Sequence, residues 1–291
     1  MYPAFESVGN HDGGNSTAPD VGLVRRAVID RNRQRAALPP ARLQALAPNY
    51  TVSANGLHYS WDWQGVHFAV LGVYPGGAGD CASGRGVSGA GCDAANPPWG
   101  WHSPEGSLDF LVSDLAALPS AATTPVVLFT HYGLRGFGAP GTAPWAGYSP
   151  DFWWSAAEAE AFALAIAGHN IVALVHGHTH ACVFYQWDLT NVTGQVIDVY
   201  NAPALQKGGA ADPLSTPSEY LVFEVDAGAD GGAGRLRAFQ RVGDGWGAVS
   251  HEKSLRPGQP ALGGAAAEPC AVGVTRVRAI GSQAVPPSTV V

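Results

Sequence analysis

The spacing of apolar residues alternates between helical and strand-like periods along the chain. Helical spacing between capping or breaking residues predicts three helices, over 20–36, 103–119 and 155–170. Short apolar runs predict four strands, over 57–63, 66–74, 124–133 and 171–180. Four later runs, separated by turns rich in Gly and Asp, also predict strands, over 196–205, 219–227, 235–242 and 246–252. Strands that alternate with helices indicate a layered α/β domain.

Two local signals refine these predictions. Gln64-Gly65 is expected to form the tight turn of a hairpin. The helix over 103–119 is expected to be capped at Ser103-Pro104. Its apolar face is predicted to contain Leu108, Leu111, Val112 and Leu115.

The composition changes at the end of the chain. From about Leu255 onward the sequence offers Pro, Gly and Ala without a usable period. We therefore expect one domain over 1–255 and a tail over 256–291 that is linker or disordered.

Composition and charge exclude some functions. The formal net charge is −7 with only 16 Lys and Arg residues, so we expect no surface for binding nucleic acid. No apolar run reaches the roughly 18 residues of a membrane span, and the N-terminus shows no export signal. We therefore expect a soluble protein, secreted or periplasmic if a signal peptide precedes Met1.

Cys81 and Cys92 lie in a Gly-rich stretch that would allow their sulfur atoms to meet. The sequence leaves open whether they form a disulfide or remain two thiols.

Residues able to bind metal follow three of the apolar runs. Asn10-His11-Asp12 comes after 2–8, which we expect to be a strand, and His131 comes after 124–130. His176, His178 and His180 alternate at the end of the last buried strand. Open α/β sheets place their active sites at such strand ends. For His176, packing behind the strand is favoured over metal contact.

These motifs resemble those of the calcineurin-like metallophosphoesterases. That family has a Gly-Asn-His followed by Asp or Glu, a solitary His after a later strand, and a final Gly-His-x-His. The corresponding residues here are Gly9-Asn10-His11-Asp12, His131, and Gly177-His178-Thr179-His180. The resemblance implies an αββα sandwich of two mixed β-sheets flanked by helices.

The resemblance also implies a role for each residue. Asn10, His131 and His178 would bind one divalent ion, and His180 a second. His11 would face the phosphate and protonate the leaving group, and Asp12 is placed to orient an imidazole. The ions would be Mn, Fe, Zn or similar, and the substrate a phosphate mono- or diester, either a small molecule or a protein.

The family's Asp-x-His and Gly-Asp-x-x-Asp motifs do not occur in this chain. In the family, these motifs supply most other ligands of the ion that His180 would bind, and the carboxylate that bridges both ions. We therefore expect an N-terminally truncated domain that binds one ion or none and hydrolyses esters weakly. Two alternatives remain: a non-catalytic relative that keeps the scaffold for binding or structure, and a different His-x-His hydrolase such as an amidohydrolase barrel.

The remaining histidines and a group of tryptophans have no such context. We expect the histidines to be structural or on the surface; they are His58, His67, His102, His169 and His251. The tryptophans could line a substrate cleft, although packing is the favoured interpretation; they are Trp99, Trp101, Trp145, Trp153 and Trp154.

Overall fold

The computed structural model describes part of the chain, namely residues 5–7, 9, 23–77, 105–133, 156–178, 183–190, 192–202, 219–226, 234–242, 245–257 and 276–278. The helices are α1 Leu23–Ala36, α2 Pro40–Leu46, α3 Ser107–Ala116 and α4 Ala156–Ala165. The strands of the large sheet are β1 Thr51–Val52, β2 Tyr59–Trp63, β3 Val66–Val70, β4 Pro125–Phe129, β5 Asn170–His176, β6 Val183–Asp188, β7 Val196–Asn201 and β11 Arg276–Arg278. Those of the small sheet are β8 Glu219–Asp226, β9 Arg235–Val242 and β10 Gly245–Ser254. The predicted α/β class is confirmed.

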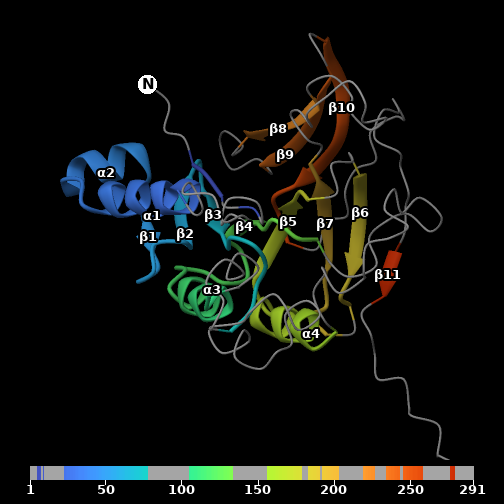
Figure 1. The fold of residues 1–291 in the computed structure, drawn as a ribbon. Helices are drawn as coiled ribbons and strands as arrows, with labels where there is room; N and C mark the ends of the chain where they lie inside the picture. Colours follow the sequence, from blue (N-terminus) through green and yellow to red (C-terminus); the bar gives the residue numbers. More distant parts are fainter. Residues whose placement is uncertain are drawn as a thin grey trace, which may run out of the picture.

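The large sheet has the order β1-β2-β3-β4-β5-β7-β6-β11. Its centre, β3-β4-β5-β7, is parallel, while β2 and β6 run antiparallel to their neighbours in that core. The carboxyl ends of β4 and β5, which precede His131 and His178, therefore meet at one edge of the sheet (Figure 1).

A register shift in β5 places two consecutive side chains on the same face of the strand. Val126 pairs with Ile171 but Val127 pairs with Ala173, so Val172 is an extra residue. Val172 and Ala173 consequently both pack toward the small sheet, whereas Ile171 and Leu174 pack on the opposite face.

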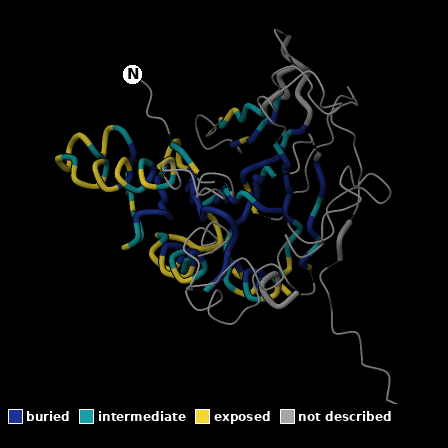
Figure 2. Tube along the Cα trace, viewed as in Figure 1, coloured by how far each residue is buried: buried dark blue, intermediate teal, exposed yellow. Residues whose placement is uncertain are grey.

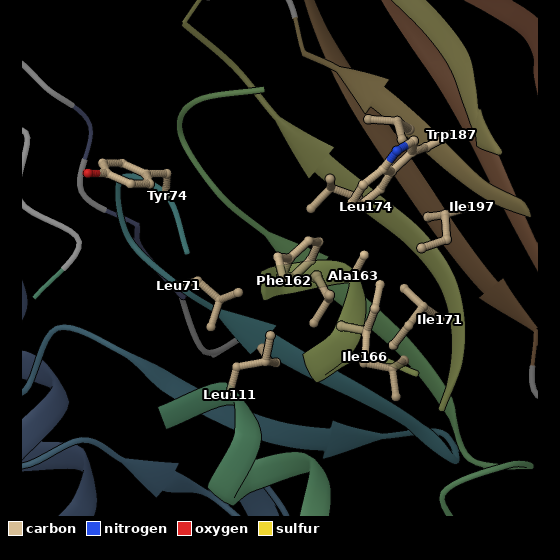
Figure 3. Packing of buried hydrophobic residues seen from close by; sticks show 14 of the residues in the cluster. Leu71, Tyr74, Leu111, Phe162, Ala163, Ile166, Ile171, Leu174, Trp187 and Ile197 are labelled. Atoms are coloured by element: carbon tan, nitrogen blue, oxygen red, sulfur yellow. The ribbon is translucent and has the colours of Figure 1, made fainter. Parts of the chain in front are cut away.

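The layers are helix, sheet and sheet. Helices α3 and α4 lie on one face of the large sheet, and β8–β10 lie on the other (Figure 1). On the helical face, Phe162 of α4 stacks on Trp187 of β6 at 5.8 Å between ring centroids (Figure 3). Among the described residues, the central strands β3, β4, β5 and β7 of the large sheet are deeply buried, whereas α1 and α2 are largely exposed beside its β1–β2 edge (Figure 2). The small sheet is antiparallel, so the expectation that both sheets are mixed is wrong for this one.

Several local predictions are confirmed. The β2–β3 hairpin turns at Gln64 and Gly65, both with positive φ, as a two-residue hairpin loop requires. His58, His67 and His251 are buried among protein groups. His169 is half-buried before β5.

Other local predictions are wrong. Helix α3 begins at Ser107 after Gly106 in a left-handed conformation and without a side-chain cap, and not at Ser103. Val112 is 48% exposed, so the buried stripe of α3 is narrower than predicted. Elements α2, β1, β6 and β11 were not predicted; β11 lies within the range expected to be a tail and pairs in parallel with β6.

The segment before Asn10 is not a strand at the described residues 5–7. It is fixed to β2 by aromatic contacts instead. Phe5 stacks on Trp61 with ring centroids 3.9 Å apart, and the Tyr59 hydroxyl donates a hydrogen bond to the Glu6 carbonyl (2.7 Å). The Arg35 guanidinium also lies over the Phe5 ring, 4.7 Å from its centroid.

A buried polar network joins the hairpin to α3. His67 contacts Asp62 through Nδ1 (2.7 Å) and Asp114 through Nε2 (2.8 Å), and Ser60 donates to Asp114 (2.6 Å). Burial alone lowers the pKa of His67, but hydrogen bonds with Asp114 and Asp62 outweigh it and raise the pKa to about 9. A charged His67 therefore lies between two carboxylates.

Within the part of the chain described here, none of the helices is long and apolar enough to cross a membrane. Several predictions concern residues outside that part: the Cys81–Cys92 pair, His102 and the five tryptophans named above.

Candidate functional site

The ends of β4 and β5 are held together beyond the last paired residues of the strands. The Thr130 amide donates to the Val175 carbonyl (3.0 Å), and the Gly177 amide donates to the His131 carbonyl (3.1 Å). On the other side of β4, the His131 amide bonds the carbonyl of Gly72, just after β3 (2.9 Å). The backbone that carries His131 is therefore fixed from both sides.

This arrangement brings His131 and His178 into contact. The Nε2 atom of His131 lies 3.3 Å from Nδ1 of His178, and the two rings are 5.1 Å apart at 72°. Tyr132 is buried and meets the His178 ring edge-on at 4.5 Å between centroids. One side of the histidine pair is thus covered by an aromatic ring.

Gly9 allows the chain to approach His131 closely. A Cβ at Gly9 would lie only 2.9 Å from Cε1 of His131, whereas a Cβ at Gly177 would make ordinary contact at 4.0 Å from Nδ1. Gly9 directly precedes Asn10 in the sequence. The N-terminal segment anchored at Phe5 therefore reaches the histidine pair at the residue just before the Asn-His-Asp motif.

His178 has a φ of 72°, in the left-handed region that residues with a Cβ seldom adopt. Such a conformation costs about 1–2 kcal/mol unless the residue is glycine. Strained backbone of this kind occurs preferentially at functional sites.

His176 packs behind the strand, as predicted. It is buried with its Nε2 2.9 Å from the Tyr185 hydroxyl and its Nδ1 3.1 Å from the Gly177 carbonyl. Burial lowers its pKa to about 4, so the ring is neutral. Both ring nitrogens have protein partners, so His176 is not available to a ligand.

The donors present suit a divalent transition metal. Two imidazole nitrogens bound tetrahedrally to one zinc ion at about 2.0–2.1 Å lie roughly 3.3 Å apart, and the observed separation of His131 and His178 is 3.3 Å. Among the described residues no group of three or more His, Cys, Asp or Glu side chains is placed to hold a metal. The other predicted site residues, Asn10, His11, Asp12 and His180, lie outside the described residues.

Two residues of this site were missed at the level of sequence. Tyr132 follows His131 directly, and its position next to a candidate metal ligand could have identified it as a residue of the site. Tyr185 lies in β6, whose alternation of Val183, Tyr185 and Trp187 with polar Gln186 could have shown the strand.

The structure also has a hollow of about 550 Å³, at the opposite edge of the sheet. Gln64, Thr123 and Pro125 are among the residues that line it, and Pro125 begins β4. It is therefore separate from the histidine pair. No protein-family model matches this chain, and no curated protein matches it.

Proposed function

We propose that this protein is a metal-dependent phosphoesterase that hydrolyses a phosphate mono- or diester. The observation that carries the proposal is the contact of His131 Nε2 with His178 Nδ1 at the carboxyl edge of a parallel sheet. The resemblance of the sequence motifs to calcineurin-like metallophosphoesterases supports the same assignment. The helix-sheet-sheet layering is compatible with that family's sandwich.

In this proposal His131 and His178 bind one divalent ion together with Asn10. The ion would act as a Lewis acid toward a phosphoryl oxygen of the substrate. Tyr132 keeps water from one side of the histidine pair. On the open side, a water molecule would attack phosphorus, and His11 would protonate the departing alkoxide as the P–O ester bond breaks. His180 is the candidate ligand of a further ion.

Hydrolysis of p-nitrophenyl phosphate and bis-p-nitrophenyl phosphate with added Mn²⁺ tests the proposal. We expect slow release of p-nitrophenol that depends on the metal and is lost in His131→Gln and His178→Gln. His169→Gln is the matched control, because His169 precedes β5 at the opposite edge of the sheet, and it should retain the rate. Equal rates in all four proteins, or rates unaffected by EDTA, would contradict the proposal.

A further inference from the structure

Both backbone polar groups of Gly177, the residue before His178, have a partner within hydrogen-bond distance. The Gly177 amide donates to the His131 carbonyl (3.1 Å), and the Gly177 carbonyl faces Nδ1 of His176 at 3.1 Å. Because a peptide unit is planar, a hydrogen bond to the Gly177 carbonyl restrains the orientation of the peptide plane that leads into His178. The φ of 72° at His178 is measured from this plane and is unfavourable by itself.

The tautomer of His176 follows from its partners. A carbonyl oxygen can only accept a hydrogen bond, so Nδ1 of His176 carries the proton and donates to Gly177. The unprotonated Nε2 then accepts from the Tyr185 hydroxyl at 2.9 Å. The Tyr185 hydroxyl therefore stabilises the tautomer whose proton lies on the nitrogen that faces the Gly177 carbonyl.

The His176 ring also touches the other histidine loop. A Cβ at Gly133 would lie 2.4 Å from Cε1 of His176, so the ring packs directly on the backbone two residues after His131. One buried side chain thus contacts the loop of His131 and the loop of His178.

We propose that His176 is a positioning residue that sets the relative placement of the His131 and His178 imidazoles. It acts through its hydrogen bond to Gly177 and its packing against Gly133, without contacting the ligand. Its effect on metal binding rests on the function proposed above, whereas its effect on the two rings does not.

Titration with Co²⁺, followed by visible absorption, measures the effect of His176 on metal binding. His176→Phe keeps a ring against Gly133 but removes the donor, and should weaken Co²⁺ binding by about tenfold to a hundredfold and shift the absorption bands. His176→Asn places an amide N–H near the position of Nδ1 and should restore most of the affinity. Tyr185→Phe should cause a smaller loss in the same direction, and His169→Asn none.

Long-range ¹H–¹⁵N spectra of the ¹⁵N-histidine protein without metal measure the placement itself. His176→Phe should shift the imidazole signals of both His131 and His178, and His176→Asn should shift them less. If His176→Phe does not fold, Tyr185→Phe decides by the same two measurements. A folded variant with wild-type imidazole signals and wild-type Co²⁺ affinity overturns the positioning role. Wild-type protein that binds no Co²⁺ while its variants still shift these signals overturns the proposed function alone.

Discussion

The left-handed backbone of His178 places an imidazole where a glycine would be more stable. His131 and His178 lie 47 residues apart in sequence, yet their nitrogens are 3.3 Å apart. Their convergence was predicted because both follow buried strands, and parallel neighbours end at the same sheet edge. The φ of His178 could not be predicted, because it depends on contacts with Gly177 and His131 that form only in the folded chain.

Exchanging His178 for Gly should relieve the strain, while exchange for Ala should not. Both variants lose the same ring contacts, but only Gly adopts φ near 72° without steric cost. We expect His178→Gly to be more stable than His178→Ala by about 1 kcal/mol in urea unfolding. Equal stability of the two variants would show that the left-handed backbone carries no strain.

At the scale of elements, the β2–β3 hairpin and α3 are joined by charge as well as by apolar packing. His67 is cross-strand from Asp62 and reaches Asp114 on α3. The sequence predicted the hairpin, because its turn and alternation are local signals. It did not predict the network, because Asp114 lies 47 residues from His67 and nothing local relates them.

The His67 network should make stability depend on pH. The pKa of His67 is raised from 6.5 to about 9. The contribution of charged His67 to the unfolding free energy is therefore complete below pH 6.5 and is lost as the pH rises through 9. His67→Gln should lower the unfolding free energy by about 3 kcal/mol near neutral pH, because a buried carboxylate loses its cation. Urea unfolding of both proteins across this range should show the difference shrinking at alkaline pH. A constant difference would mean that His67 is neutral throughout, and His169→Gln is the control.

Strand β6, one of the missed elements, contains a polar residue whose partner lies on another strand. The half-buried Gln186 side chain donates to Asp198 of the neighbouring β7 (3.1 Å). Asp198 in turn lies 3.3 Å from Lys253 of the small sheet, and both of these charged residues are buried. Helix α2 begins at Pro40, shortly after α1 ends at Ala36, with the proline in its first turn.

At the scale of the whole molecule, one edge of the large sheet brings the N-terminal segment together with the ends of two central strands. The N-terminal segment is anchored on β2 by Phe5 and reaches His131 at Gly9, while β4 and β5 supply the two histidines. The layered α/β class was predictable from the alternation of helical and strand periods. The position of the N-terminal segment was not, because it depends on an aromatic stack with Trp61 and on contact with Arg35.

Zinc K-edge X-ray absorption on the protein loaded with an equimolar amount of Zn²⁺ tests most directly whether His131 and His178 bind the same ion. We expect at least two imidazole ligands with zinc–nitrogen distances of about 2.0–2.1 Å. Each of His131→Gln and His178→Gln should remove one imidazole from the spectrum, while His169→Gln leaves it unchanged. A wild-type spectrum without imidazole ligands, or one that neither substitution alters, would contradict a metal site at this pair.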